Sequence, residues 1–232
     1  MNLFYAPDLS SEKKEYIFDK GESRHIAKVL RKSIGDILYI TNGLGDLFTV
    51  KIADNNPNKT RVEIIESSHR PSSPKYIHIA IAPTKSIDRF EWFLEKAVEI
   101  GVNEITPILT EHSERKKINP ERLERVIIAA MKQSLRLHKP ILNPLTKWGD
   151  FIQNRKEDQK FIAYCKAEKN LSTLLKPVPS YLLCIGPEGG FSPQEIELAK
   201  ENNFILAGLS KNRLRTETAG IVGLTSIQVC VN

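Results

Sequence analysis

A glycine-rich turn between an apolar run and a capped helix start constrains this chain more than any other feature. The apolar run covers residues 182–185, and the turn covers residues 186–190. Ser192 suits the N-cap of the next helix, Pro193 suits its first position, and Glu195 stands where it completes a capping box. A strand, a glycine loop and a capped helix in this order expose backbone N–H groups to a small ligand.

The composition is that of a soluble globular protein. The chain has 232 residues, 41% of them hydrophobic and 27% charged, which allows one large domain or two smaller ones. The net charge of +6 weakly favours a polyanionic partner. We expect neither a signal peptide nor a membrane span, because no uncharged apolar run approaches the ~20 residues that a span needs.

The cysteines and histidines predict neither disulfides nor a metal site. Cys165, Cys184 and Cys230 are odd in number, lie far apart and form no CxxC motif, which fits a reducing cytosol and a cytoplasmic protein. The five histidines are scattered and none has a second ligand at i+3 or i+4.

Residues 1–70 carry short strand-like runs separated by turn signals. A short basic helix candidate covers residues 24–31, and the apolar runs that follow cover residues 37–40, 47–52 and 61–65. Closely spaced strands of this kind predict a small β-barrel or sandwich. The polar, proline-containing stretch 67–74 predicts a linker.

From about residue 75 the pattern changes to alternating strands and helices. The expected strands cover residues 76–82, 104–109, 161–165, 181–185 and 204–206, and the expected helices cover residues 86–101, 120–137, 193–201 and 217–231. This alternation predicts an α/β domain over residues 71–232 with a mostly parallel sheet. The last helix is apolar on nearly every face, so it must be buried in a core or against a second subunit.

The glycine turn has two interpretations. It is either a tight turn that needs a positive φ or a cradle for a ligand, and the capping box beside it favours the cradle. No Gly-Lys-Ser/Thr follows, so it is not a Walker A loop, and its late position disfavours a dinucleotide-binding fingerprint.

A second loop, residues 208–219, precedes the last helix. Thr216 can cap that helix, and Glu217 in the first turn favours the helix dipole. Arg213 and Arg215 face the like-signed helix terminus, which predicts that an anion binds there, either phosphate or a developing oxyanion. Residues 115–139 form a basic stripe that is either a solvated surface or a contact for backbone phosphates.

The two late loops together resemble those of the small-subunit ribosomal RNA uridine N3-methyltransferases of the SPOUT superfamily. The similar motifs are Gly-Pro-Glu-Gly-Gly-Phe-Ser at 186–192 and Leu-Arg-Thr-Glu-Thr-Ala at 214–219. The segments 88–92, 96–102, 133–136 and 25–36 also resemble this family, so the likeness covers nearly the whole chain. The chain departs from the family pattern in four places: Ser210 and Leu135 replace glycines, Arg213 replaces an apolar residue, and residues 2–5 lack the arginine that family members often carry close to the N-terminus.

The resemblance implies a PUA-like β-barrel over residues 1–70 and a SPOUT-type α/β domain with a trefoil knot over residues 71–232. It implies a cytoplasmic homodimer that methylates N3 of one uridine in 16S ribosomal RNA, either free or in the small ribosomal subunit. The methyl donor is S-adenosyl-L-methionine, and neither a metal nor a membrane is involved.

The resemblance and the residue chemistry together nominate three sets of site residues. The catalytic candidates are Arg215, Arg136 and Glu217. The donor-binding candidates are Gly186, Pro187, Glu188, Gly189, Gly190, Leu209, Ser210, Leu214, Arg215 and Thr216. The RNA-binding candidates are Arg24, His25, Arg31, Arg115, Lys116, Lys132, Arg136 and Arg213.

Two other functions stay open at this point. One is an RNA-binding adapter of ribosome assembly without catalysis, which would not bind S-adenosylmethionine. The other is a nucleotide-cofactor oxidoreductase, which the late position of the glycine loop disfavours.

Overall fold

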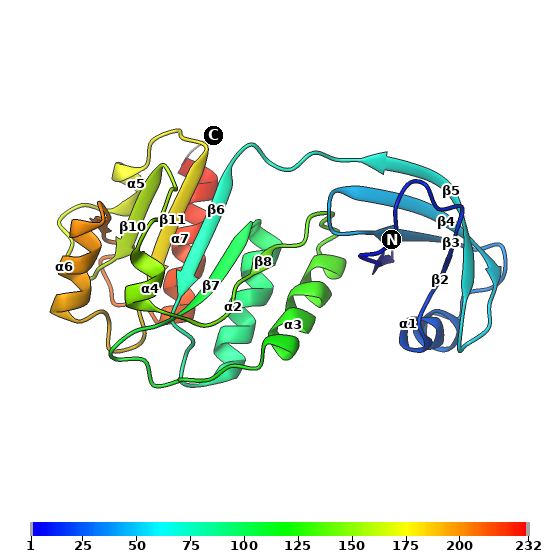
Figure 1. Cartoon of the computed structure of the whole chain (residues 1–232), viewed down its shortest axis with the longest axis horizontal. Coiled ribbons are helices and arrows are strands. Elements are labelled where there is room, and N and C mark those ends of the chain that lie inside the picture. Colours follow the sequence, from blue (N-terminus) through cyan, green and yellow to red (C-terminus); the bar gives the residue numbers. More distant parts are fainter. Residues whose placement is uncertain (1, 231–232) are drawn as a thin grey trace. The chain divides into compact units, whose positions relative to one another are not determined.

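The computed structural model of the protein describes residues 2–230 and divides into two compact units. The first unit contains the chain up to Ser72 together with Met131–Lys139, and the second contains Ser73–Ala130 and the chain from Pro140 onward. Figure 1 shows the elements of each unit.

The first unit is built on a five-stranded sheet with the order β1-β3-β4-β5-β2. Its core contains Phe4, Phe18, Ile40, Phe48 and Val62. The strands are β1 (Leu3–Tyr5), β2 (Glu15–Ile17), β3 (Ile37–Thr41), β4 (Asp46–Asp54) and β5 (Arg61–His69), and helix α1 (Lys20–Arg24) continues into a π-helical turn, His25–Val29. Strands β3 to β5 lie where the sequence predicts them, whereas β1 and β2 are too short to be found from periodicity.

The predicted linker at 67–74 is wrong in its first part. Ser67, Ser68 and His69 belong to β5 and pair with Phe48, Leu47 and Asp46 of β4. Their polarity reflects exposure, because Ser67, Ser68 and His69 are all exposed. A polar run on an exposed strand cannot be told from a linker by composition alone.

The second unit is a parallel sheet covered on both faces. The strand order is β12-β10-β11-β6-β7-β8, with β9 also paired to β7. The strands are β6 (Tyr76–Ile81), β7 (Glu104–Leu109), β8 (Ile141–Leu142), β9 (Thr146–Lys147), β10 (Gln159–Ala163), β11 (Ser180–Ile185) and β12 (Ile205–Ala207). The central strands β6 and β11 are almost wholly buried, as a parallel sheet requires.

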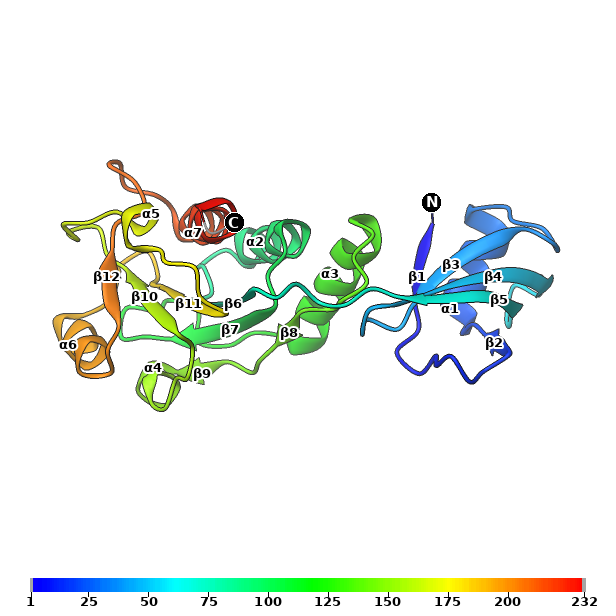
Figure 2. The same ribbon diagram turned by 90° about the horizontal axis from the view of Figure 1, so that it is seen from above.

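Helices lie on both sides of this sheet, as Figure 2 shows. One face carries α2 (Ile87–Ile100), α5 (Leu171–Leu174) and α7 (Thr216–Cys230), and the other carries α4 (Trp148–Ile152) and α6 (Pro193–Glu201). The remaining helix is α3 (Pro120–Gln133). Helices α2, α6 and α7 begin and end within one or two residues of the predicted positions, although Val231 of the last prediction lies outside the described residues.

Helix α7 packs closely against the sheet because two of its residues are glycines. A Cβ at Gly220 would lie 2.6 Å from the Phe93 ring of α2 and 3.1 Å from Ile81 Cδ1 of β6, and a Cβ at Gly223 would lie 2.2 Å from Leu183 Cδ2 of β11. The helix contacts β6, β11, α2 and α5. The sheet therefore fixes where α7 begins and where the loop before it ends.

Helix α3 ends earlier than the predicted helix over 120–137. Leu135 has a left-handed φ of 56°, which ends the helical geometry. Beyond it the chain joins the first unit, because the Leu137 carbonyl accepts hydrogen bonds from the Thr41 hydroxyl and the Gly45 N–H. This long-range pairing overrides the local helical pattern.

Replacing Leu135 by Gly should raise the free energy of unfolding by about 0.5 kcal/mol. The left-handed backbone costs a non-glycine residue roughly 1–2 kcal/mol, and the greater entropy of an unfolded glycine offsets part of that gain. Urea unfolding of Leu135→Gly measures the effect. The control is Ile34→Gly, an exposed turn residue without a positive φ, which should lose roughly 0.5–1 kcal/mol; an equal loss in Leu135→Gly would contradict the account.

Candidate functional site

Four loops meet at one edge of the parallel sheet. Strands β6, β7, β11 and β12 belong to one sheet in which all these strands run parallel, so their carboxyl ends lie at the same edge. The loops that follow them are 82–86, 110–119, 186–192 and 208–215. Ligands of open α/β sheets bind at this edge.

The glycine loop after β11 has no room for side chains at two positions. A Cβ at Gly186 would lie 3.0 Å from the Phe191 ring, and a Cβ at Gly189 would lie 2.9 Å from the His112 Cβ. Gly190 has a φ of +74°, and its N–H donates to the Pro187 carbonyl at 2.8 Å. The tight-turn interpretation therefore holds at Gly190, whereas close packing requires glycine at Gly186 and Gly189.

The capping box is confirmed. The Ser192 hydroxyl accepts from the Glu195 N–H, and Glu195 Oε2 accepts from the Ser192 N–H at 2.9 Å. Glu195 Oε1 also accepts from the Glu111 N–H at 2.9 Å. The same carboxylate thus joins the glycine loop to the loop after β7.

The second predicted loop is hydrogen-bonded to the first. The Thr216 hydroxyl donates to the Gly186 carbonyl at 3.2 Å, and Arg213 Nη2 donates to the Glu188 carbonyl at 2.7 Å. The structure therefore brings the two sets of donor-binding candidates together. Among them Ser210 is exposed, and its hydroxyl accepts from the Asn212 N–H, while Leu209 and Leu214 are half-buried.

Thr216 does not cap the last helix, contrary to the sequence prediction. The first backbone carbonyl to accept a hydrogen bond from the residue four positions later is that of Arg215, which accepts from the Ala219 N–H at 2.8 Å. Thr216 is the first residue of the helix, and its hydroxyl is used on Gly186. The Thr216 hydroxyl thus bonds to the glycine loop instead of capping the helix.

The catalytic candidates at this edge differ in exposure. Arg215 is exposed, whereas Glu217 is buried with its Oε1 3.9 Å from Arg89 Nε. Arg89 lies in segment 88–92, which resembles the family, but it was not among the predicted site residues because its contact with Glu217 joins α2 to α7, far apart in the sequence.

The loops after β6 and β7 support the glycine loop. The Lys85 N–H donates to Glu188 Oε1 at 3.2 Å, and His112 Nδ1 donates to the Gly190 carbonyl at 3.2 Å. Arg115 and Lys116 follow in the same loop as His112. Lys85 and His112 were not among the predicted site residues, because their contacts join segments far apart in the sequence.

The remaining RNA-binding candidates lie in the first unit. Arg24 ends α1, His25 begins the π-helical turn, and Arg31 has a left-handed φ of 52°. Lys132 lies 2.5 Å from Glu22 Oε1 and 5.5 Å above the Phe4 ring. Lys132 is therefore already engaged by its own unit.

Arg136 also belongs to the first unit, whereas Arg215 and Glu217 belong to the second. Its guanidinium is half-buried, and burial lowers its pKa. The Nε atom is buried with no hydrogen-bond partner among the described residues. An anion would satisfy such a group.

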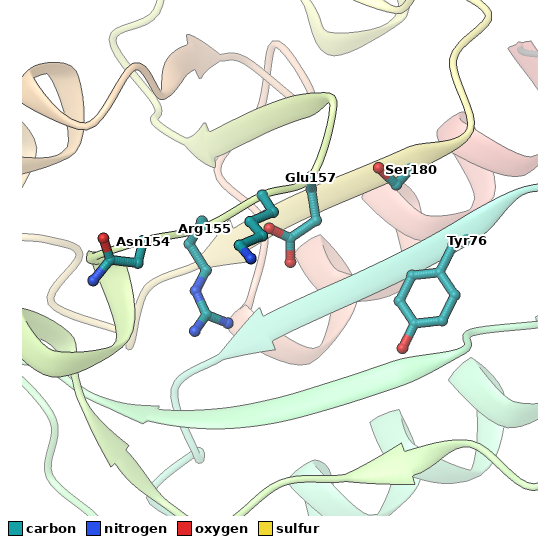
Figure 3. A pocket seen from close by; sticks show the side chains of 6 residues that line it. Tyr76, Asn154, Arg155, Glu157 and Ser180 are labelled. Atoms are coloured by element: carbon teal, nitrogen blue, oxygen red, sulfur yellow. The ribbon is translucent and has the colours of Figure 1, made fainter.

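A second polar cluster lies at the opposite edge of the parallel sheet. A hollow of about 370 Å³ is lined there by Tyr76, Asn154, Arg155, Lys156, Glu157 and Ser180, and Figure 3 shows these side chains. His78 behind it is fully buried, with Nδ1 2.9 Å from Glu157 Oε1 and Nε2 2.7 Å from Thr106 Oγ1. Asn143 Nδ2 donates to Thr106 Oγ1 at 2.7 Å, and the Glu157 carboxylate accepts from His78 Nδ1–H.

Comparisons with known proteins show the family to which this chain belongs. The model of an RNA methyltransferase domain matches residues 71–228, and the model of an RNA methyltransferase PUA domain matches residues 18–65. A ribosomal RNA small subunit methyltransferase E of Buchnera aphidicola is 31% identical over 92% of this chain and 88% of its own length. The chain belongs to the small-subunit ribosomal RNA methyltransferase E family.

Solved structures of this family share the whole fold. A probable rRNA-methyltransferase from Porphyromonas gingivalis is 38% identical with a TM-score of 0.91, covering 99% of both chains. The family E enzyme of Neisseria gonorrhoeae, solved bound to S-adenosylmethionine, is 26% identical with a TM-score of 0.91 and covers 100% of this chain and 98% of its own. The resemblance and the expected α/β domain with a preceding PUA-like barrel are confirmed.

Two further expectations concern absences. Between residues 2 and 230, no helix is long and apolar enough to cross a membrane. In the same range, no cluster of three or more His, Cys, Asp or Glu side chains is arranged to hold a metal ion.

Replacing Glu157 by Gln should destabilise the protein in a pH-dependent way. Burial alone would raise the pKa of Glu157, but its hydrogen bonds with His78 and the backbone hold that pKa below the usual value. The stabilisation is therefore present above the unfolded pKa and is lost as pH falls through the folded pKa. At pH 7 Glu157→Gln should lower the free energy of unfolding by about 1 kcal/mol, and the loss should be smaller at about pH 3.5, below the usual carboxyl pKa.

Urea unfolding at the two pH values measures this difference. The control is Glu197→Gln on α6, an exposed carboxylate paired with Lys200, which should change stability by less than about 0.5 kcal/mol at either pH. An equal loss in Glu157→Gln at both pH values would show that the carboxylate charge is not what stabilises the network.

Proposed function

We propose that this protein transfers the methyl group of S-adenosylmethionine to N3 of one uridine in small-subunit ribosomal RNA. The observation that carries the proposal is the direct bonding of the two late loops, through Thr216 to Gly186 and Arg213 to Glu188. The family and its S-adenosylmethionine-bound member support the donor and the RNA class.

The residues at the edge fit this donor. Glu188 Oε2 is buried and has no hydrogen-bond partner in the described part of the chain, so it can accept from a ligand hydroxyl or amine. The position that a Cβ at Gly190 would take is open space, which leaves room for a ligand against the backbone. Backbone groups of residues 186–190, 209–210 and 214–216 would hold the adenosine and methionine parts.

The donor, when bound, supplies a methyl group that its sulfonium makes strongly electrophilic. The protein must align this group with N3 and assist the loss of the N3 proton. The negative charge then spreads onto the uracil carbonyl oxygens, where a positioned guanidinium stabilises it. Arg215 is our first candidate for this role and Arg136 the second. Glu217, two residues from Arg215, is the candidate proton acceptor.

The RNA contacts follow from the basic residues of both units. The target base must leave its stack to reach the donor, and cationic side chains hold the flanking phosphates. We assign this contact to Arg24, His25, Arg31, Lys132 and Arg136 in the first unit and to Arg115, Lys116 and Arg213 in the second. Lys132 would exchange its partner Glu22 for phosphate.

The assembly is a homodimer formed through α7 and α2. These helices pack on each other, yet Val229 of α7 remains 66% exposed and Trp92 of α2 remains 44% exposed.

Gly208 is hydrogen-bonded to Lys169 and Leu171, and α5 then packs on α7, which supports a trefoil knot in this part of the chain. Three free cysteines support a cytoplasmic location.

Replacing Arg215 by Ala should abolish methyl transfer and leave donor binding unchanged. The guanidinium is exposed and makes no ion pair within the described chain, so its loss removes charge stabilisation without disturbing the loops. A loss of at least about 100-fold in kcat is expected. Isothermal titration with S-adenosylmethionine and a methylation assay measure the two effects.

Two variants in the same loop serve as controls. Lys211 is exposed, so Lys211→Ala should retain both methyl transfer and donor binding. Arg213→Ala removes the bond to the Glu188 carbonyl and should weaken donor binding. Retained transfer in Arg215→Ala would remove that residue from its role.

The reaction itself is tested on the RNA. Mass spectrometry of small-subunit ribosomal RNA from a strain lacking the gene should show one missing N3-methyluridine, restored by the wild-type gene. An unchanged modification pattern, or no heat on titration with S-adenosylmethionine, would favour the adapter function instead.

A further inference from the structure

A basic hollow lies next to the glycine loop in the second unit. It measures about 430 Å³ and is lined by Lys85, Glu114, Arg115, Lys116 and Lys117. Lys85 comes from the loop after β6, and the other four come from the loop after β7. The Lys85 N–H donates to the Glu188 side chain, so one residue that lines the hollow also contacts the glycine loop.

The charges of the hollow are only partly neutralised. Lys85 Nζ lies 2.9 Å from Glu114 Oε2, which raises the pKa of Lys85. Lys116 and Lys117 are exposed, and neither forms an ion pair within residues 2–230. No aromatic or large apolar side chain is among the lining residues, which suits a phosphate rather than a stacked base.

Arg115 ties this hollow to the backbone beside it. Its Nε donates to the Thr84 carbonyl at 3.0 Å, and its Nη2 donates to the Lys85 carbonyl at 2.6 Å. A guanidinium has five N–H groups, so others remain free to bind an anion. Arg115 can therefore hold the 84–85 backbone and a phosphate at the same time.

The hydrogen bonds continue from this backbone into the donor-binding loop. Lys85, whose carbonyl accepts from Arg115, donates its own N–H to Glu188 Oε1 at 3.2 Å. Arg213 holds the Glu188 carbonyl from the other side. Lys85 thus positions Glu188 directly, and Arg115 positions it indirectly, through its bond to Lys85.

We propose that this hollow binds a backbone phosphate of the substrate RNA and that Arg115 couples its occupancy to the glycine loop. Bound phosphate orders Arg115, Arg115 orders the 84–85 backbone, and that backbone holds Glu188 ready for the donor. RNA therefore tightens donor binding, and the donor tightens RNA binding by the same factor. The proposal rests on the proposed function, because it assumes that the loop binds S-adenosylmethionine.

The coupling is measured by titrating S-adenosylhomocysteine, which cannot react, with and without an unmethylated small-subunit ribosomal RNA fragment. In the wild-type protein the RNA should lower the Kd of S-adenosylhomocysteine by about five-fold or more. Arg115→Lys keeps the charge but replaces the planar fork, which donates to the two carbonyls from two different nitrogens, by a single ammonium group. It should bind RNA within about two-fold of wild type and lose the tightening.

The phosphate contact is measured by the salt dependence of RNA binding. Lys116→Gln and Lys117→Gln should each lower the slope of log affinity against log salt by about one. The matched control is Lys200→Gln on α6, which does not line the hollow and should keep the wild-type slope.

Two results would overturn the proposal: salt slopes of the Lys116 and Lys117 variants equal to that of the control, or tightening that persists in Arg115→Lys. Each leaves the proposed function intact if the wild-type protein binds S-adenosylhomocysteine. Absence of that binding would overturn the proposed function, and this proposal with it.

Discussion

The hydrogen bond from the Thr216 hydroxyl to the Gly186 carbonyl joins two turns that lie 30 residues apart in the chain. Both turns follow parallel strands of one sheet, so the sheet brings them to the same edge, and this bond sets their separation. The Arg213 bond to the Glu188 carbonyl holds the next residues of each turn together. A donor with two ends, an adenosine and a methionine, needs such a pair of fixed backbone surfaces.

The rest of the second unit can be understood as support for that junction. Gly220 and Gly223 allow α7 to lie directly on β6 and β11, which fixes the helix start and hence Thr216. The capping box of α6 fixes the other side of the glycine loop, and its Glu195 carboxylate also holds the Glu111 N–H. The loop is therefore held by three neighbouring segments, and a preorganised loop loses little entropy when a ligand binds.

Local features of the sequence predicted the structure well, and long-range contacts explain most of what they missed. The capping box and the strand before it depend on neighbours within a few residues, so the sequence shows them directly. The end of α3 depends on the pairing of Leu137 with Thr41 and Gly45, which no local pattern reveals. The same reason explains why Lys85, His112 and Arg89 were missed, and why Thr216 was taken for a cap although its hydroxyl is used on Gly186.

The most direct measurement is a crystal structure of the protein soaked with S-adenosylhomocysteine. The account predicts that the ligand contacts the backbone of residues 186–190 and of residues 208–216 in one site, with Glu188 Oε2 bonded to it. Ligand density at another place, or contact with only one of the two loops, would contradict the claim that their junction forms the donor site.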